Sequence, residues 1–368
     1  MTRIAFVVWT LRGMGGSERV VYDIARKLNK ELYTAIIVSF EDGPVRKVYE
    51  NIGVKVHVIE KKKRIDIKFV RDLRRILLRE DINIVNPHHF VQLKYSFLAT
   101  RFSRIKLVYT EHSRWQLEQL SPLNSILNKL FLLRSDAVIA ISKQIEDYYR
   151  NRIKLREEKI HFIANGIDLT VYQNGDGDHL RRQLGIDQQE RVVGMVGNIR
   201  PEKNHKLLIS AFSRVAKKLK NVRLLLVGLD CMDGQVQRFA SNNGASEKIL
   251  FLGKRDDVPE LLKVFDLFCL PSMYEGMPLT VLEAMASGVP VIGSDTLGIN
   301  EVIRDNVNGL LFPVNDEKRL TDLMMGLLAN DGLRARLSEA GKSSVEQCYS
   351  LCDKIKQYDQ LFQMLHIQ

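Results

Sequence analysis

The chain has 368 residues, of which 45% are hydrophobic and 27% are charged, and its formal net charge at pH 7 is +11. This length suits two domains of about 100–200 residues each, and no apolar run approaches the roughly 18–20 residues that a membrane span needs. The apolar stretch within residues 1–9 is too short for a signal peptide, and the four cysteines are scattered, so we expect free thiols and a cytoplasmic protein.

Short apolar runs alternate with longer helix-like runs along the chain, which is the pattern of parallel α/β sheets. The predicted strands cover residues 4–8, 35–39, 54–59, 82–85, 106–110 and 137–141 in the first half, and residues 192–196, 223–227, 249–252, 267–270 and 289–292 in the second. The polar, glycine-rich stretch Asn174–Asp178 between them is typical of a turn or linker. We therefore predict two doubly wound domains over residues 1–165 and 191–348, a linker over 166–190 and a last helix within 349–368.

The positive charge lies in the first half. Residues 1–165 contain 31 basic and 18 acidic residues, whereas the rest of the chain contains 24 and 26. The densest basic stretch is the run Lys61–Arg64, followed by a predicted amphipathic helix. The apolar face of this helix contains Ile67, Val70, Leu73 and Leu77, and its basic face contains Lys68, Arg71, Arg75 and Arg79.

Two interpretations of this basic helix remain open, a solvated charged face and attraction to an anionic membrane. The second is worth up to about 1 kcal/mol per nearby Lys or Arg. A nucleic-acid partner is not expected, because no zinc finger, aromatic RNA motif or helix-turn-helix pattern accompanies the charge.

A glycine-rich turn, Gly13-Met-Gly-Gly-Ser-Glu18, follows the first predicted strand and opens a helix. Its backbone can approach a phosphate or a sugar closely. A dinucleotide site is the alternative, but its fingerprint G-x-G-x-x-G requires glycine where Glu18 stands. The acidic pair Glu41–Asp42 after the second strand keeps that alternative open.

His112 follows the middle strand at residues 106–110, at the carboxyl end where α/β sites gather. His88 and His89 end the preceding strand. A histidine in such a place is either a hydrogen-bonded structural group or a ligand-contacting one.

Two carboxylates stand eight positions apart in Pro271–Pro290, in a predicted strand–loop–helix–strand unit. Pro278 suits the first helical turn and Gly288 the end of the helix. On one continuous helix Glu275 and Glu283 would lie about 80° apart, so we expect Glu275 to come from the loop. Both then flank a helix N-terminus, whose free N–H groups and dipole favour a diphosphate. The pattern predicts a nucleotide-sugar pocket.

The segment containing Glu275 and Glu283 resembles the donor-site signature of the retaining family 4 glycosyltransferases, in which two glutamates are separated by seven residues. The resemblance extends over nearly the whole chain in the expected order. The other landmarks are Gly15-Gly-Ser-Glu-Arg19, Glu111-His-Ser113, Ile163-Ala-Asn-Gly-Ile-Asp168, Val196-Gly197, Pro201-Glu-Lys203, Phe251-Leu-Gly253 and Gly298-Ile-Asn-Glu301.

The resemblance implies the GT-B fold, two facing Rossmann-like domains with parallel sheets, whose last helix crosses back onto the N-terminal domain. That domain binds the acceptor and the second binds the donor. The implied catalytic residues are His112 and Glu275, and the implied donor-binding residues are Gly15, Gly16, Arg200, Lys203, Gly276, Met277, Leu279 and Glu283. Glu283 would bind the ribose and Glu275 the donor sugar.

The phosphate side departs from the family pattern, because Asn198 follows Gly197 where an arginine is usual. Arg200 lies two residues later, and we expect it to take over this contact beside Lys203. Asp176 and Asp178 form an Asp-x-Asp pair among linker glycines, so we expect turn residues there and no metal. The nucleotide sugar is a cosubstrate, and no cofactor is expected.

The implied activity is retaining transfer of a hexose-type sugar from a nucleoside-diphosphate sugar, with UDP favoured, to a glycan or lipid-linked acceptor in polysaccharide, lipopolysaccharide or glycolipid synthesis. The basic first half fits a protein that is peripheral on the inner face of the plasma membrane. A nucleotide-sugar epimerase on the same fold is the alternative enzyme. A non-catalytic nucleotide-sugar-binding subunit is the alternative without chemistry, against which the presence of both Glu275 and Glu283 argues.

Overall fold

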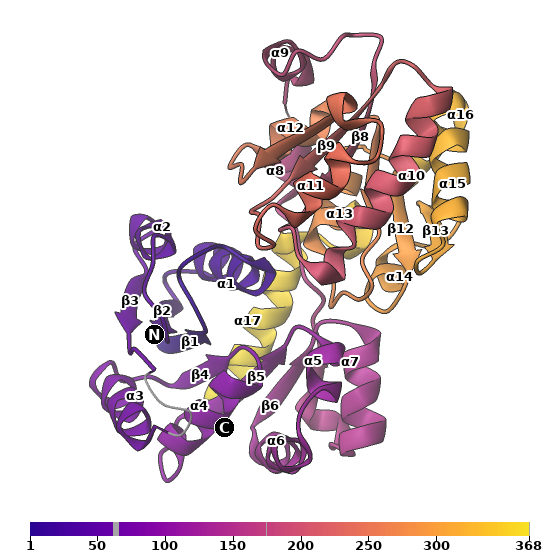
Figure 1. Cartoon of the computed structure of the whole chain (residues 1–368). Coiled ribbons are helices and arrows are strands. Elements are labelled where there is room, and N and C mark those ends of the chain that lie inside the picture. Colours follow the sequence, from indigo (N-terminus) through magenta and orange to yellow (C-terminus); the bar gives the residue numbers. More distant parts are fainter. Residues whose placement is uncertain (62–65, 174, 368) are drawn as a thin grey trace. The chain divides into compact units, whose positions relative to one another are not determined.

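The computed structural model describes residues 1–61, 66–173 and 175–367, so Lys62, Lys63 and Arg64 of the basic run and Asn174 of the expected linker lie outside the described residues. The chain forms two compact units (Figure 1). Unit 1 contains Met1–Gly166 and the segment from Leu351 onward, and unit 2 contains Ile167–Ser350.

Unit 1 is built on a parallel sheet with the strand order β3-β2-β1-β4-β5-β6-β7. Helices cover both faces, so the central strand β1 is an almost continuous buried run, as is usual for parallel sheets. The strands are β1 (Thr2–Val8), β2 (Tyr33–Ser39), β3 (Lys55–Val58), β4 (Ile84–Pro87), β5 (Lys106–Glu111), β6 (Ala137–Ala140) and β7 (Ile160–Phe162). The helices are α1 (Gly16–Lys27), α2 (Val45–Asn51), α3 (Ile67–Arg79), α4 (Phe90–Thr100), α5 (Arg114–Glu118), α6 (Pro122–Arg134), α7 (Lys143–Asp147) and α17 (Leu351–Ile367), with a π-helical turn at Tyr148–Ile153 and a 3-10 turn at Glu157–Lys159.

Two expectations for unit 1 were wrong in detail. The edge strand β7 was not predicted, because its three residues are only half-buried and do not form an apolar run. Ile67 was expected on the core face of α3, but its side chain is 81% exposed and Phe69 is buried instead. The reason is that Asp66 caps α3 by accepting from the Phe69 amide, so Ile67 lies in the first, solvated turn.

The C-terminal helix α17 packs within unit 1. Its buried Phe362 lies edge-on to Tyr33 of β2 at 6.0 Å between ring centroids, and the Tyr33 hydroxyl donates to Asp359. A Cβ on Gly166 would lie 2.8 Å from the Cα of Leu351. Glycine at position 166 therefore permits the start of α17 to approach the end of the first segment.

Unit 2 is built on a second parallel sheet, with the order β10-β9-β8-β11-β12-β13. The strands are β8 (Arg191–Val196), β9 (Val222–Val227), β10 (Ile249–Gly253), β11 (Leu267–Leu270), β12 (Val291–Asp295) and β13 (Leu310–Pro313). The helices are α8 (Leu169–Gln173), α9 (Gly177–Gln183), α10 (His205–Lys218), α11 (Gln235–Ser241), α12 (Val258–Val264), α13 (Leu279–Ala286), α14 (Ile299–Val302), α15 (Glu317–Ala329) and α16 (Asp331–Cys348), with 3-10 turns at Pro201–Lys203 and Ser246–Lys248.

The segment 166–190, expected as a linker, carries the short helices α8 and α9, which pack on α12 inside unit 2. Asp176 caps α9 by accepting from the Asp178 amide at 2.9 Å. The same Asp and Gly residues that are typical of a linker thus start a helix here. The last predicted strand was placed two residues early, because Val289 still bonds back to Ala284 at the end of α13.

Because every ladder is parallel, the strands of each sheet release their following loops at one edge. In unit 1 this edge carries the residues after β4 and β5, and in unit 2 it carries the residues after β8, β11 and β12. Within the described part of the chain, no helix is long and apolar enough to cross a membrane.

A substitution at Gly194 in β8 would test the packing of the sheet in unit 2. A Cβ there would lie 2.1 Å from the ring of Phe265, so we expect Gly194→Ala to lower the free energy of unfolding by about 1–3 kcal/mol through overpacking. Gly326 inside α15 is the matched control, because nothing lies within 4 Å of its added Cβ. Gly326→Ala should raise the stability by about 0.5–1 kcal/mol. Thermal unfolding followed by circular dichroism measures both, and equal midpoints would contradict this packing.

Candidate active site

Three histidines meet at the carboxyl edge of the sheet in unit 1. His88 and His89 directly follow β4, and His112 directly follows β5. Nδ1 of His88 lies 2.6 Å from Nε2 of His112, and the two rings stack at 4.9 Å between centroids. The His89 ring lies 5.1 Å from that of His112. The structure thus brings the predicted His112 together with both histidines of the preceding strand.

Asn86 of β4 determines which ring nitrogens carry protons. Its Nδ2 donates to the Val108 carbonyl at 2.6 Å, so its Oδ1 is left to face Nε2 of His88 at 3.1 Å. An amide oxygen only accepts, and Nε2 of His88 must therefore donate. In neutral His88, Nδ1 is then an acceptor, and Nε2 of His112 donates to it. Neutral His112 is left with an unprotonated Nδ1.

Burial keeps both of these rings neutral. It lowers the pKa of His88 to about 3, with His89 adding to the effect. Burial also lowers the pKa of His112 well below its ordinary value of 6.5, assisted by His88 and His89. A charged imidazole would lose its hydration in this site, which disfavours the protonated form.

Glu111, the last residue of β5, links the residues of this cluster through its carboxylate. Its side chain is 1% exposed, and its Oε1 accepts from the amides of His112 at 2.7 Å and Ser113 at 3.1 Å. Nδ1 of His89 lies 2.8 Å from the same oxygen, and the Tyr109 hydroxyl donates to Oε2 at 2.5 Å. Burial works to raise the pKa of Glu111, but His89 and these hydrogen bonds lower it overall.

Glu111 and burial act on the pKa of His89 in opposite directions. Burial alone would lower the pKa of His89, yet Glu111, with a smaller contribution from Glu18, raises it. The backbone of His89 has φ +72° and ψ 161°, a conformation that residues with a side chain rarely adopt. Such strain is commonly found at functional sites.

The glycine turn before α1 belongs to the same neighbourhood, since Glu18 in the first turn of α1 acts on the pKa of His89. Gly15 is the residue before α1, and Gly16 is its first residue. A Cβ on Gly15 would lie 2.6 Å from the Glu18 carboxylate, whereas one on Gly16 would meet nothing within 4 Å. Gly15 therefore leaves room for Glu18, and Gly16 leaves an open approach to the helix N-terminus.

In unit 2, Glu275 lies in the loop after β11, as its spacing from Glu283 predicted. Its Oε1 accepts from Nζ of Lys203 at 2.5 Å and from the buried Ser272 hydroxyl at 2.6 Å. Lys203 comes from the 3-10 turn after β8, and Met273 bonds to the Glu202 carbonyl of this turn at 2.8 Å. The predicted phosphate-binding lysine and the predicted sugar-binding carboxylate therefore form an ion pair.

The loop after β12 fixes the loop that carries Glu275. Thr296 donates to the Met273 carbonyl at 2.8 Å, the Ser294 hydroxyl donates to that of Ser272, and the Glu275 amide donates to that of Leu297. Gly298 has φ +87°, and a Cβ there would lie 2.4 Å from the Gly276 carbonyl oxygen. Only glycine permits this approach.

Glu283 lies on α13, with Oε1 accepting from the Tyr172 hydroxyl at 2.8 Å. Helix α13 begins at Leu279 and has no side-chain cap, so the Leu279 and Thr280 amides are at its open N-terminus. Pro278 was expected in the first helical turn, but it is the residue before it, with extended backbone. Met277, which follows Gly276 in this loop, is buried.

The structure accounts for Asn198. Its Oδ1 accepts from the Leu229 amide at 3.1 Å, in the loop after β9. A Cβ on Gly228 would lie 2.1 Å from the Gly197 carbonyl oxygen, so the two loops are in close contact. Arg200 is exposed at the start of the 3-10 turn that ends in Lys203.

Sequence reasoning missed four residues of these two clusters, Asn86, Glu18, Ser272 and Tyr172. Ser272 and Glu18 lie within quoted motifs, but neither has a spacing that indicates its partner. Asn86 bonds to a strand 22 residues away, and Tyr172 meets Glu283 across 111 residues. No local pattern encodes such long-range contacts.

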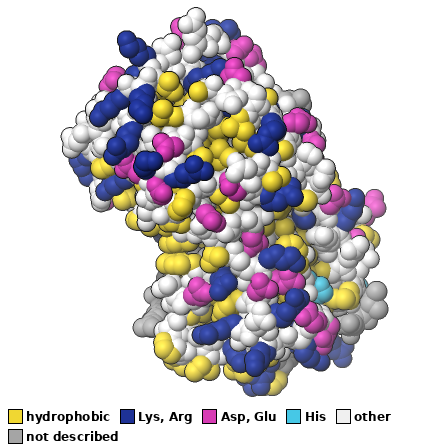
Figure 2. Space-filling view, turned by 90° about the vertical axis from the view of Figure 1, so that its right-hand side faces the viewer, with side chains coloured by type: hydrophobic (Ala, Val, Ile, Leu, Met, Phe, Trp, Pro, Cys, Tyr) yellow, Lys and Arg dark blue, Asp and Glu magenta, His cyan; other side chains and the backbone are white. Residues whose placement is uncertain are grey.

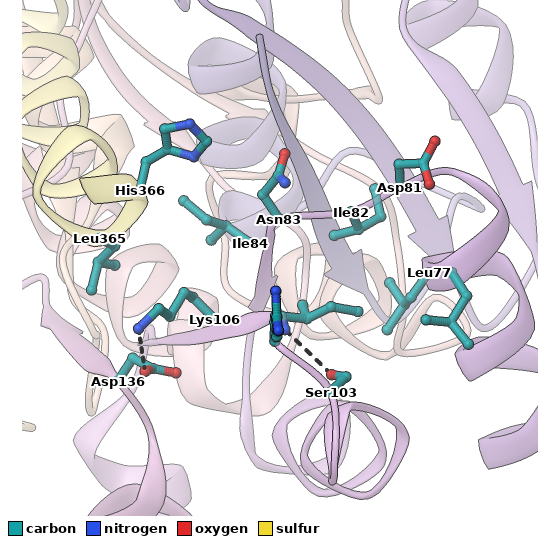
Figure 3. Close-up of a pocket in the computed structure, with 13 residues that line it drawn as sticks. Leu77, Asp81, Ile82, Asn83, Ile84, Ser103, Lys106, Asp136, Leu365 and His366 are labelled. Carbon is teal, nitrogen blue, oxygen red and sulfur yellow. Dashed lines mark hydrogen bonds and ion pairs between the residues drawn. The ribbon is translucent and has the colours of Figure 1, made fainter. Parts of the chain in front are cut away.

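A groove of about 700 Å³ lies at the opposite edge of the unit 1 sheet (Figure 3). It is lined by the residues before and at the amino ends of β4, β5 and β6, including Asn83, Lys106 and Asp136. Lys106 and Asp136 pair with one another at 3.5 Å across it. None of the predicted site residues line this groove. The described residues include no group of three or more His, Cys, Asp or Glu side chains placed to hold a metal ion.

Comparison with known proteins identifies the family of this chain. The family model described as "Glycosyltransferase Family 4" matches residues 14–171, and that described as "Glycosyl transferases group 1" matches residues 176–344. N-acetyl-alpha-D-glucosaminyl L-malate synthase of Bacillus anthracis is 28% identical over 360 residues, which cover 95% of this chain and 94% of that protein. UDP-Gal:alpha-D-GlcNAc-diphosphoundecaprenol alpha-1,3-galactosyltransferase of Escherichia coli is 24% identical over 319 residues, 82% of each.

A solved structure of Anabaena HepE in complex with UDP and glucose covers 99% of this chain and 100% of its own, with a TM-score of 0.88 at 23% identity. This likeness confirms the predicted fold class, two parallel-sheet domains of the GT-B type. Since the two family models together match nearly the whole chain, the chain belongs to the group 1, or family 4, glycosyltransferases.

Proposed function

We propose that this glycosyltransferase transfers a hexose-type sugar, with retention of the anomeric configuration, from a UDP-sugar to a hydroxyl of a glycan or lipid-linked acceptor. The first domain, residues 1–165, binds the acceptor, and the second, residues 191–348, binds the donor. The protein works in the cytoplasm, peripheral to the inner face of the plasma membrane, in polysaccharide, lipopolysaccharide or glycolipid synthesis.

The observation that carries this proposal is the arrangement around the N-terminus of α13. Two carboxylates flank an uncapped helix start, and a lysine is hydrogen-bonded to one of them. The open amides of Leu279 and Thr280 suit a diphosphate, and Glu283 suits a pair of ribose hydroxyls. Glu275 then accepts from the sugar, and Lys203 and Arg200 balance the charge of the leaving diphosphate.

In unit 1 we assign the sugar contact to His112. Its unprotonated Nδ1 accepts a hydrogen bond from a sugar hydroxyl, as the family resemblance implies for this position. The open N-terminus of α1 at Gly15 and Gly16 accommodates phosphate or sugar oxygens. His89 and Glu111 keep the loop after β5 in place.

In the proposed front-face reaction, the bond between the anomeric carbon and the β-phosphate oxygen breaks, and the acceptor oxygen bonds to the same face of the carbon. The acceptor's proton passes to the departing phosphate oxygen. The protein therefore has to position the donor and stabilise the developing phosphate charge, rather than supply a nucleophile.

The name of one relative supports a UDP-sugar donor, and the names of the relatives contain acceptors of several classes. One name contains a diphosphoundecaprenol acceptor and another contains L-malate. We favour the lipid-linked class because of the basic first half of the chain.

A panel of donors and acceptors tests the function. UDP-, GDP- and ADP-hexoses are compared by thermal shift, since a ligand that binds the folded state raises the midpoint by mass action. The donor that binds is then incubated with a polyprenyl-diphosphate saccharide or with L-malate, and NMR gives the anomeric configuration of the product. An inverted anomer, or conversion of the donor without any acceptor, contradicts the proposal.

Glu283→Gln should weaken the binding of the UDP-sugar about tenfold to a hundredfold, because hydrogen bonds to a charged acceptor contribute about 1.5–3 kcal/mol. Isothermal titration calorimetry measures the dissociation constant. Glu339→Gln on the exposed side of α16 is the control and should bind as the unaltered protein does. Equal affinity in all three proteins removes Glu283 from the donor site.

The pH dependence of kcat/KM should show no loss of activity as the pH falls through 6.5. His112 must be neutral to accept through Nδ1, and its pKa lies well below 6.5. Below pH 6.5 the unfolded state, with ordinary histidine pKa values, binds more protons than the folded state. The free energy of unfolding therefore decreases as the pH is lowered in this range. Circular dichroism at each pH separates unfolding from titration. An acidic limb near pH 6.5 in folded protein would mean that His112 titrates freely.

His88→Phe should lower kcat about tenfold or more, because the buried Nε2–H of His112 loses its acceptor, at a cost of about 1–3 kcal/mol. His88→Asn should restore much of this rate, since its Oδ1 replaces the Nδ1 acceptor. The affinity for the donor should change little in either variant. If the asparagine variant is as slow as the phenylalanine variant while both remain folded, His88 does not orient His112.

A further inference from the structure

Two neighbouring helices of unit 1 carry no acidic residue. Residues 90–110, which include α4, and residues 119–135, which include α6, contain no Asp or Glu. The helices pack together through Phe97 and Phe131, whose ring centroids are 4.6 Å apart. Neither helix therefore contributes a carboxylate to the surface, although the chain contains 44 acidic residues.

Helix α6 is apolar on its outer side as well as its inner side. Phe131 and Leu132 are buried against the unit, whereas Leu123 and Ile126 are 67% and 68% exposed. Leu130 and Leu133 continue the exposed row. The spacing of three, four and three residues places all four side chains on one face of the helix. No described residue of unit 1 covers this row.

The end of α4, which packs against α6, exposes further apolar side chains. Leu98 is 40% exposed and Phe102 is 89% exposed, with the Arg101 guanidinium over the Phe102 ring. Arg104, Lys129 and Arg134 are exposed beside them. We call these apolar and basic residues the α4/α6 surface. Seen from the side of α5 and α7, unit 1 carries Lys and Arg side chains next to hydrophobic ones at its lower end (Figure 2).

The charge of the α4/α6 surface determines what it can bind. Within the described residues no carboxylate pairs with Lys129 or Arg134. A second copy of the chain docked symmetrically on this surface would bring like charges together. An anionic lipid bilayer instead offers phosphates to the cations and acyl chains to the leucines.

Helix α3, the basic helix of the sequence analysis, is less suited to this role. Its Arg75 pairs with Asp72 at 3.3 Å, and Arg71 lies 3.8 Å from the same carboxylate. Its exposed apolar residues, Ile67 and Leu78, stand three turns apart and do not form a row. Part of its charge is already neutralised.

We propose that unit 1 docks on anionic lipid bilayers through the α4/α6 surface. Helix α6 lies along the interface, with Leu123, Ile126, Leu130 and Leu133 at the boundary between headgroups and acyl chains. The flanking Arg and Lys side chains bind lipid phosphates. This inference rests on the proposed function, because it names the surface by which the enzyme reaches a lipid-linked acceptor.

Flotation of the full chain with vesicles tests the proposal. The unaltered protein should bind vesicles of phosphatidylcholine and phosphatidylglycerol at low salt, and bind vesicles of phosphatidylcholine alone far less. The double variant Leu123→Ser, Ile126→Ser should bind at least about tenfold more weakly, because it removes two apolar side chains that the proposal places in the bilayer. The double variant Ile67→Ser, Leu78→Ser on α3 is the matched control and should bind as the unaltered protein does.

A second variant tests the charge of the α4/α6 surface without changing its apolar side chains. Lys129→Glu, Arg134→Glu leaves the apolar row intact and should abolish the preference for phosphatidylglycerol. Substitutions at such exposed positions usually change stability by less than about 0.5 kcal/mol, which a thermal melt verifies. The proposal is overturned if the unaltered protein does not float, if both α6 variants bind normally, or if light scattering shows a dimer that the α6 variants dissociate.

Thermal shift with the UDP-sugar, measured on the same variants, separates this inference from the proposed function. Donor binding should be unchanged in the α6 variants, because none of the proposed donor-binding residues lies on α6. If no nucleotide sugar binds but the vesicles do, the proposed donor chemistry fails while the lipid surface stands. If the donor binds but the vesicles do not, only the lipid surface fails.

Discussion

Both units depend on the parallel ladder of their central sheets. A parallel sheet buries its strands on both faces, so polar side chains are confined to the loops at the strand ends. All strands of one sheet point the same way, and residues far apart in the sequence therefore reach the same edge. His88 and His112 meet in this way in unit 1, as do Lys203 and Glu275 in unit 2. The catalytic candidates are placed by strand order rather than by local sequence.

Buried polar groups then determine the chemistry of the edge in unit 1. The Val108 carbonyl orients the Asn86 amide, the amide sets the tautomer of His88, and His88 sets that of His112. Glu111 accepts a hydrogen bond from the His112 amide and so fixes the backbone after β5. Its carboxylate also contacts Nδ1 of His89 and favours the protonated form of that ring. Each buried group has a partner, and removing one would leave the next unpaired at a cost that exceeds the strength of an ordinary hydrogen bond.

The strands, the loop position of Glu275 and the helical position of Glu283 could be predicted because apolar runs, Pro278 and Gly288 mark them locally. The short edge strands β7 and β13 were not predicted, since His161 interrupts β7 and the three apolar residues of β13 end at Pro313. The partner of Glu283 is Tyr172, which lies in a segment whose Asp and Gly residues indicated a linker. Contacts that exist only after folding, such as Gly298 against Gly276, leave no periodic pattern in the sequence.

The ion pair between Lys203 and Glu275 has a consequence for the proposed donor site, because each charge already has a partner. Ser272 and the loop after β12 already fix the Glu275 carboxylate, so a ligand would lose little side-chain entropy in binding to it. One ammonium group, however, cannot bind Glu275 and a diphosphate each as strongly as it would bind either one alone. If Lys203 binds the donor as proposed, binding is an exchange of partners, in which an incoming phosphate competes with a carboxylate for one ammonium group, and a neutral sugar alone has nothing with which to compete.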